Sequence, residues 1–358
     1  MFSFEDYITS HTWHFARTDG SMISPIFRFL PDGRIGGHIH PNERFWEIND
    51  NVLLLKNMTG ETSTRINQFT WDKDGIVKMS GPTRYTEENG HVFERVTIPS
   101  FADLGQESKW KGLPPFQKIL SPTAKKRKNL VVLRAGKNSL HTKWERNIDE
   151  CDKNWDLCLS WYDAEIPEEM VECEYFSHQP NDRKFGPIFG LFEENSPLWA
   201  YENIWLPDDD LETTWADINR MFNIFKYNHF DIAQPSLAPQ SYVNHSITIQ
   251  KPEFYFRYTT FVEVMCPIFK RDIWKICVKP LEGSISGFGL DHIWIALQGR
   301  LCSRVAIIDD VAVVHTRPMG KNYDLDSAMQ EGMQLMGLCC VGAFFFEVGG
   351  LQRDFNIL

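Results

Sequence analysis

Three adjacent carboxylates, Asp208, Asp209 and Asp210, directly follow the segment YENIWLP at residues 201–207. Like charges at this spacing repel one another unless a cation or hydrogen-bond donors neutralise them. Asp208 and Asp210 are alternate residues, so their side chains can point the same way and hold one ion. Oxygen ligands favour Mg²⁺ or Mn²⁺, the ions that bridge diphosphate oxygens. The alternative is that Asp209 or Asp210 caps the helix predicted over LETTWADINRMFNIFKY.

A glycine-rich turn, SGFGLDHIW at residues 286–294, places Asp291 and His292 at the start of a predicted apolar helix. Glycines let the backbone approach a bound molecule closely. Asp291 could therefore bind an acceptor hydroxyl or take its proton as a general base, with Gly289 and His292 as further acceptor-binding candidates. The alternative is that Asp291 only caps the helix.

The predicted strand within RVAIIDDVAVVHTRP, residues 304–318, ends in His315 and is followed by Arg317. A neutral imidazole is a suitable third ligand for a divalent ion that carboxylates already hold. Arg317 could pair with a phosphate. A purely structural role for His315 is the alternative, because histidines are often partly buried.

These residues need a sheet to position them. After Asn129, apolar runs such as LVVLRAG and WDLCLSWYD alternate with helix-compatible segments. This alternation indicates an α/β fold with a Rossmann-like, mixed but mostly parallel sheet and flanking helices. Ligands of such sheets bind at the carboxyl ends of the strands. We therefore predict a catalytic domain over residues 128–358 with its site at that edge.

Residues 23–95 have a different sequence pattern, in which short apolar segments are separated by turn residues. The segments PIFRFL-PDG-RIGG, ERFWEI-NDN-VLLLKN and STRINQFTW-DKDG-IVKMSG are typical of hairpins. They predict a small antiparallel β-sandwich or partial barrel within an accessory domain, residues 1–105. A segment rich in proline, glycine and lysine is the predicted linker, residues 106–127.

Composition narrows the partners and the compartment. With 48 acidic and 37 basic residues and a net charge of -11, the surface should repel nucleic acid. The eight cysteines form no CxxC pair, which favours a reducing cytoplasm. The N-terminus, MFSFEDYITSHTW, lacks the basic start and apolar run of an export signal. We expect a cytoplasmic protein with at most peripheral association at the inner face of the membrane.

The order of these motifs resembles the GT-A glycosyltransferase plan: YENIWLPDDD, a strand FVEVMCPIF, GFGLDHIW, and a strand that ends VVHTRP. More closely, residues 128–318 are similar to an uncharacterised GT-A-like family shared by plants and bacteria. The resemblance implies that Asp208 and Asp210 hold a metal and donor with the help of His315, and that Asp291 lies on the acceptor side. It further implies donor contacts from Arg134, Gly136, Asp163, Lys184, Asp209 and Arg317. The PDDD run departs from a simple DxD motif and leaves open whether Asp208 with Asp210, or Asp209, ligates the metal.

The N-terminal segment around HPNERFW, residues 40–46, is similar to a small β domain of bacterial enzymes that assemble capsule or lipopolysaccharide sugars. Trp46 and Asn42 could form a sugar-stacking surface. The alternative is that Trp46 belongs to the core. His38 and His40 occupy alternate positions and could bind a metal, although strand alternation alone often produces such pairs.

These features predict a metal-dependent glycosyltransferase with Mn²⁺ or Mg²⁺ as cofactor. It would move a sugar from a nucleotide-diphosphate donor to a hydroxyl of a surface polysaccharide, or of a related or lipid-linked glycan. Two rival hypotheses use the same residues. One is a metal-dependent nucleotidyltransferase, and the other is a non-catalytic carbohydrate-binding protein.

Overall fold

The computed structural model describes residues 3–38, 40–50, 52–73, 75–84, 89–96, 118–119, 127–144, 152–166, 173–180, 182–299, 302–318, 324–338 and 347–353. The chain divides into two units. The first combines Met1–Ile98, Ile293–Leu301 and Leu338–Val341; the second combines Pro99–His292, Cys302–Gly337 and Gly342–Leu358. Most of the predicted linker, residues 106–117 and 120–126, lies outside the described residues.

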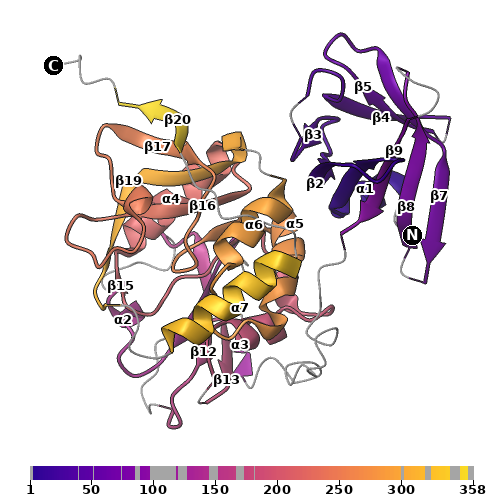
Figure 1. The fold of residues 1–358 in the computed structure, drawn as a ribbon. Coiled ribbons are helices and arrows are strands. Elements are labelled where there is room, and N and C mark those ends of the chain that lie inside the picture. The colour runs from indigo at the N-terminus through magenta and orange to yellow at the C-terminus, as the bar shows by residue number, and fades with distance from the viewer. Residues whose placement is uncertain are drawn as a thin grey trace. The chain divides into compact units, whose positions relative to one another are not determined.

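The N-terminal part of the first unit is built of antiparallel strands (Figure 1). They are β1 (Trp13–Arg17), β2 (Met22–Phe29), β3 (Ile35–Gly36), β4 (Phe45–Asn49), β5 (Val52–Lys56), β6 (Thr62–Ile66), β7 (Gln68–Asp72), β8 (Gly75–Pro82) and β9 (Gly90–Arg95). A six-stranded sheet has the order β3-β2-β1-β9-β8-β7, and a three-stranded sheet has the order β4-β5-β6, among the described residues. Helix α1 (Phe4–Ser10) precedes them and begins with a capping box between Ser3 and Asp6.

The hairpins predicted from turn residues are confirmed: β2 pairs with β3, β4 with β5 and β7 with β8, all antiparallel. Their core is aromatic. The rings of Phe15 and Phe93 stack with centroids 4.6 Å apart, and Phe27 contacts both.

Trp46 belongs to this core. It is 5 % exposed, and its indole N–H donates to the carbonyl oxygen of Leu30 at 2.9 Å. The proposed sugar-stacking surface of Asn42 and Trp46 is therefore wrong for Trp46, because its ring faces other side chains and not solvent. Asn42 is partly exposed.

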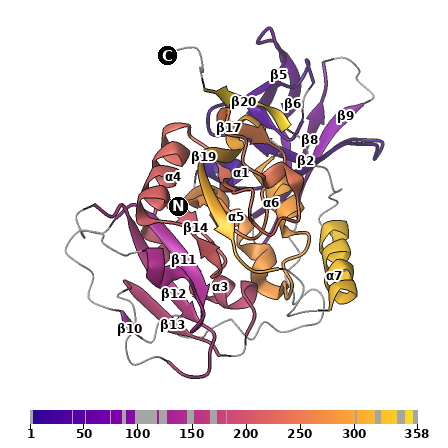
Figure 2. The same cartoon turned by 90° about the vertical axis from the view of Figure 1, so that its left-hand side faces the viewer.

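The rest of the chain forms a large sheet with helices around it (Figures 1 and 2). The strands are β10 (Lys118–Ile119), β11 (Asn129–Ala135), β12 (Trp155–Trp161), β13 (Tyr175–His178), β14 (Asn203–Trp205), β15 (Leu211–Glu212), β16 (Ile232–Leu237), β17 (Phe254–Thr259), β18 (Ile268–Lys270), β19 (Val305–His315) and β20 (Glu347–Gln352). The helices are α2 (His141–Trp144), α3 (Phe185–Leu191), α4 (Trp215–Tyr227), α5 (Arg271–Cys277) and α7 (Leu325–Leu338). Helix α6 (Leu290–Gln298) begins in the second unit, and its residues from Ile293 onward belong to the first.

The large sheet is mixed. Its order in the described residues is β10-β13-β12-β11-β14-β18-β16-β19-β17-β20, with β15 paired to β19. Parallel pairing joins β13, β12, β11 and β14, which lie side by side in Figure 2, and also joins β16 to β19. The other pairings are antiparallel. The α/β prediction holds, but the predicted predominance of parallel strands does not, since β18 enters antiparallel between β14 and β16.

Continuous apolar runs explain the buried strands. All seven residues of β11 and of β12 are buried, as expected for strands covered on both faces. Helix α4 packs on β19 and contributes Met221, Phe222 and Phe225 to the same core. Of the helices in the described residues, none is both long and apolar enough to cross a membrane.

Candidate functional site

The end of β14 and the end of β19 meet at the edge of the sheet. Strand β15, which follows the three aspartates, pairs antiparallel with β19 so that Leu211 lies opposite His315. The backbone N–H and the hydroxyl of Thr316 both donate to the carbonyl oxygen of Asp210, at 3.1 and 2.8 Å. Two motifs far apart in the sequence are thereby joined, as the topological rule for strand ends predicts.

Asp210 and His315 face each other at this junction. The distance from His315 Nε2 to Asp210 Oδ2 is 3.4 Å, and the two residues are 4 % and 9 % exposed. His315 Nδ1 donates to the carbonyl oxygen of Tyr242 at 2.8 Å, which directs Nε2 toward the carboxylate. Burial lowers the pKa of His315, but the hydrogen bond and the charge of Asp210 outweigh it and raise the pKa overall.

One oxygen of this pair has no partner. Asp210 Oδ1 is buried and makes no hydrogen bond within the described residues. An unpaired buried carboxylate oxygen is costly and calls for a ligand such as a cation. A carboxylate and an imidazole side by side are a suitable donor set for Mn²⁺ or Mg²⁺, and more generally for a first-row divalent metal.

Asp208 has a different partner. Lys184 Nζ lies 2.5 Å from Asp208 Oδ1 and also donates to the carbonyl oxygens of Leu206 and Val264, both at 3.1 Å. Desolvation raises the pKa of Asp208, although 37 % of its side chain is exposed, and the charge of Lys184 opposes that rise. In the described residues the ligand atoms of Asp208, Asp210 and His315 do not all lie within 4.8 Å of one another. An ion shared by all three requires Asp208 to turn from Lys184.

Asp209 is engaged by protein donors. Tyr162 Oη donates to its Oδ2 at 2.7 Å, and Arg317 Nη1 lies 3.3 Å from its Oδ1. Burial raises the pKa of Asp209 to about 6 despite these two contacts. Because both its oxygens have partners while Asp210 Oδ1 has none, the geometry favours Asp210 over Asp209 as a ligand.

The helix-cap interpretation of the aspartates is wrong. Helix α4 begins after Thr214, whose hydroxyl accepts from the backbone N–H of Asp217 at 3.2 Å. The cap lies four residues beyond Asp210, on the far side of β15, so the aspartates must be explained in another way.

Asp291 lies in the first turn of α6, and its pKa rises to about 7 because it is buried. Helix α6 begins at Leu290, and the Asp291 carboxylate accepts from the backbone N–H of His292 at 2.9 Å, so it serves the first turn of the helix as the capping alternative expects. Gly289 adopts φ +84°, where a side chain would also meet the carbonyl oxygen of Gly332 at 2.9 Å. The ring of His292 lies 5.6 Å from that of Phe261.

Sequence reasoning missed Glu263, which is 3 % exposed. The segment FVEVMCPIF was predicted as a strand, but only its end enters β18, and Glu263 lies in the connection from β17. Asn244 Nδ2 donates to its Oε1 at 2.9 Å, while Oε2 is buried without a partner in the described residues. Burial raises its pKa to about 7, and the charges of Asp291, His315 and Asp208 all act on it. A single carboxylate inside an apolar run was the available signal.

Four of the six predicted donor residues gather around Tyr162, namely Gly136, Asp163, Asp209 and Arg317, whereas Lys184 contacts Asp208. A side chain at Gly136 would lie 2.4 Å from the Tyr162 ring, so glycine is what lets this ring reach Asp209. Asp163 Oδ2 accepts from the backbone N–H of Lys137 at 2.6 Å, and Arg317 also donates to the carbonyl oxygen of Asn138. The loops after β11 and β12 are thus joined beside Asp209.

Arg134 has a structural role, because its terminal guanidinium nitrogens donate hydrogen bonds to other groups of the protein. It is 5 % exposed, and its Nη atoms donate to Ser160 Oγ at 3.1 Å and to the carbonyl oxygen of Asp182 at 2.8 Å. Burial lowers its pKa to about 10. Its guanidinium ties β11 and β12 to the segment after β13, so the donor contact predicted for Arg134 is not available to its terminal nitrogens in this arrangement.

We expect the variant Glu263→Gln to be more stable than the wild type at pH 8. The folded-state pKa of about 7 exceeds the ordinary value of 4.5, so the folded state holds the proton longer than the unfolded state does. The stability that protonated Glu263 contributes is therefore fully present below pH 4.5 and is lost as the pH rises through 7. Thermal unfolding in EDTA from pH 4.5 to 8 should show the difference grow with pH. The exposed Glu194→Gln control should show no such trend, and a constant offset between Glu263→Gln and wild type would contradict the assignment.

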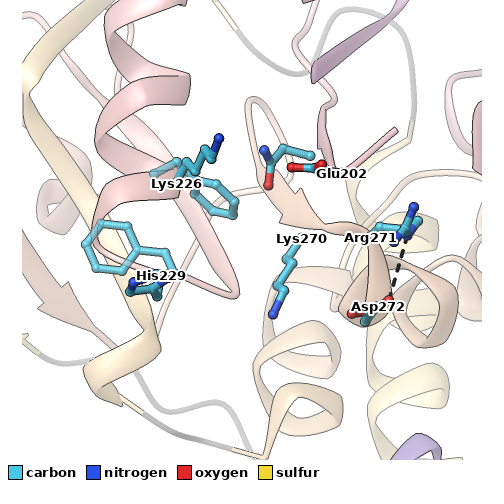
Figure 3. A pocket seen from close by; sticks show the side chains of 9 residues that line it. Glu202, Lys226, His229, Lys270, Arg271 and Asp272 are labelled. Carbon is cyan, nitrogen blue, oxygen red and sulfur yellow. Dashed lines mark ion pairs between the residues drawn. The ribbon is translucent and has the colours of Figure 1, made fainter. Parts of the chain in front are cut away.

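A cavity of about 290 Å³ lies at the other end of β14, away from the aspartates. Figure 3 shows the side chains around it, which include Lys226, His229, Lys270 and Arg271. Arg271 lies 3.8 Å from Asp272, a weak exposed pair. Because ligands of such sheets bind at the carboxyl ends of the strands, we do not place the candidate site here.

No family model and no curated protein matches the chain. Among solved structures, a protein assigned as a nucleotide-diphospho-sugar transferase from Desulfovibrio desulfuricans G20 is 12% identical, with a TM-score of 0.31; the match covers 60% of this chain and 97% of that one. TarS of S. aureus is 10% identical, with a TM-score of 0.39, over 59% of this chain and 39% of its own. Its segment 1–349 gives a TM-score of 0.35 at 10% identity, over 59% and 71%. At such TM-scores the function must be inferred from the residues of the site itself.

Proposed function

We propose that this chain is a metal-dependent glycosyltransferase that uses a nucleotide-diphosphate sugar as donor. The acceptor is a hydroxyl of a surface polysaccharide, of a related glycan or of a lipid-linked glycan. The observation that supports it most is the buried, unpartnered Oδ1 of Asp210 beside His315 at the carboxyl edge of the sheet. The motif order, which resembles the GT-A plan, supports the same reaction class. We place this activity in the cytoplasm, at or near the inner face of the membrane.

The acidic residues take two different roles in this proposal. Asp210 and His315 would hold Mn²⁺ or Mg²⁺ together with Asp208 once that side chain has turned from Lys184, and Asp209 keeps Tyr162 and Arg317 in place beside the donor. When bound, the ion would supply Lewis-acid charge that offsets the negative charge on the departing nucleoside diphosphate. Arg317 adds a guanidinium at the same edge, suited to a phosphate oxygen.

The proton of the acceptor hydroxyl needs a base if the reaction inverts the anomeric centre. As the bond from the sugar to the diphosphate breaks and the bond to the acceptor oxygen forms, a carboxylate takes the hydroxyl proton. Asp291 and Glu263 both have a pKa of about 7, which is close to the optimum for general-base catalysis near neutral pH. A retaining reaction does not require this base.

A donor panel tests the proposal. The purified chain is incubated with nucleotide-diphosphate sugars, with and without Mn²⁺ or Mg²⁺, and released nucleoside diphosphate is measured. We expect release from one donor that depends on the metal and stops with EDTA. Release of diphosphate from a nucleoside triphosphate instead would favour a nucleotidyltransferase. Glycan binding without turnover of any donor would favour a carbohydrate-binding protein.

A further inference from the structure

A second cluster of metal-ligand side chains lies in the N-terminal β unit, away from the proposed catalytic residues in sequence. His38, His40 and Glu43 each offer one ligand atom, and these three atoms all lie within 4.8 Å of one another. Among the described residues, these are the three histidine, cysteine, aspartate or glutamate side chains that lie close enough together to share one ion. The three side chains belong to the turn between β3 and β4, where the backbone of Glu43 donates to the carbonyl oxygen of His40 at 3.2 Å.

The distances are close to those of a tetrahedral zinc site. His38 Nε2 and His40 Nδ1 lie 3.4 and 2.9 Å from the same oxygen, Oε2 of Glu43. Zinc bonds of about 2.0–2.1 Å at tetrahedral angles put neighbouring ligand atoms about 3.3 Å apart. The His38 distance already agrees, and the His40 distance is short by a few tenths of an ångström. The His40 side chain is 51 % exposed, so it has room to move outward by that amount.

His40 Nδ1 has two neighbours with opposite needs. It lies 2.9 Å from the Glu43 oxygen, which is an acceptor, and 3.3 Å from the backbone N–H of Asn42, which is a donor. An imidazole nitrogen carries either one proton or one lone pair, so it satisfies one of these neighbours at a time. A proton or a metal ion between Nδ1 and the Glu43 oxygen satisfies the closer pair, and either one replaces the longer Asn42 contact.

The surroundings hold His38 and Glu43 in position. The His38 ring packs edge-on to Phe15 at 5.3 Å and lies 6.1 Å from Phe27. The preceding Gly37 has φ +75°, and a side chain there would lie 2.0 Å from the carbonyl oxygen of Ile26. The Glu43 side chain is only 7 % exposed, so its charge is buried and needs a partner.

His91 lies near the cluster. Its ring packs edge-on to Phe15 with centroids 4.6 Å apart, and the His38 ring packs on the same Phe15. Thr64 Oγ1 lies 2.8 Å from His91 Nδ1, so this histidine has a protein partner of its own and is not counted among the ligands.

We propose that His38, His40 and Glu43 form a divalent-metal site with a preference for Zn²⁺, and that the fourth position is open to water on the exposed side of His40. Two imidazoles and a carboxylate are a donor set that zinc favours, and they differ from the oxygen-rich set around Asp208 and Asp210. The site is independent of the proposed sugar transfer.

Zinc titration of the untagged full-length chain tests the site. After EDTA treatment and removal of the chelator, Zn²⁺ affinity is measured by calorimetry, and Co²⁺ is used as a spectroscopic probe of imidazole ligation. We expect His40→Gln and Glu43→Gln to weaken Zn²⁺ binding by about 100-fold or more, since loss of a direct ligand should exceed the 10–100-fold effect of outer-shell changes.

Two control variants distinguish Zn²⁺ binding at this site from Zn²⁺ binding elsewhere in the chain. His14→Gln removes another histidine of the same unit, and Asp210→Asn removes the candidate ligand of the catalytic site; both should retain the Zn²⁺ affinity and the Co²⁺ spectrum. Circular dichroism checks the fold of each variant, and His40→Gln, a change at an exposed side chain, should leave the spectrum unchanged. Equal Zn²⁺ affinity of wild type, His40→Gln and Glu43→Gln, or no binding by the wild type, would overturn the proposal. Loss of Zn²⁺ binding only in Asp210→Asn would also overturn it.

Discussion

Replacing Asp210 by asparagine should lower metal-dependent turnover by about 10³-fold while the protein stays folded. A metal ion that acts as a Lewis acid contributes several kcal/mol to transition-state stabilisation, and about 4 kcal/mol corresponds to 10³ in rate. Asparagine keeps the shape of the side chain but loses the charge, and Asp210 Oδ1 is the oxygen without a protein partner. The measurement is kcat for release of nucleoside diphosphate at saturating Mn²⁺.

His315→Gln should produce a loss of similar size, because Nε2 of His315 lies 3.4 Å from the same carboxylate and would share its ion. Asp272→Asn, at an exposed residue on the other edge of the sheet, is the matched control and should keep full activity. Raising the Mn²⁺ concentration should partly restore the variants if metal affinity is the cause. Unchanged kcat in both Asp210→Asn and His315→Gln would refute the assigned metal site.

The sequence predicted those features that depend on local pattern. Turn residues located the hairpins β2–β3, β4–β5 and β7–β8, and continuous apolar runs located β11 and β12. The rule that strand ends meet at one edge correctly brought Asp210 and His315 together, because it needs only the strand order and no side-chain detail.

Features that depend on tertiary pairing could not be predicted in this way. Nothing local shows that β18 enters the sheet antiparallel, since its three residues would suit either direction. The contact of Lys184 with Asp208 and that of Tyr162 with Asp209 join distant segments without a motif. Glu263 was hidden because an apolar run was taken as a strand, whereas its backbone N–H donates to Gln234 Oε1 at 2.6 Å in a connection.

The role of Trp46 also could not be decided from the sequence. An aromatic residue beside turn residues suits either a sugar-binding surface or a core, and composition does not distinguish them. Only the indole contact with the carbonyl oxygen of Leu30 and the packing on Phe29 decide for the core.

The buried pair Arg257 and Asp309 supports the strand that delivers His315, and breaking it should cost about 3–5 kcal/mol of unfolding free energy. Arg257 Nε and Nη2 donate to the two oxygens of Asp309 at 2.7 and 2.9 Å, and both side chains are at most 1 % exposed. Asp309 lies on β19 and Arg257 on the neighbouring β17. Among the described residues, Asp309→Ala would leave the buried guanidinium with Glu347, which is 29 % exposed, as its one ionic partner.

Urea unfolding followed by circular dichroism measures this loss. Glu202→Ala is the control, because it breaks an exposed pair with Lys128 of similar length, 2.6 Å, and should cost less than about 1 kcal/mol. Asp309→Asn, which keeps the shape and one acceptor oxygen, should fall between the two. Since β19 continues from Asp309 to His315, Asp309→Ala should also weaken Mn²⁺ binding in the folded protein more than Glu202→Ala does. A cost for Asp309→Ala no larger than that of the surface control would show that water or a rearranged β20 compensates the guanidinium, and that the catalytic edge does not depend on this pair.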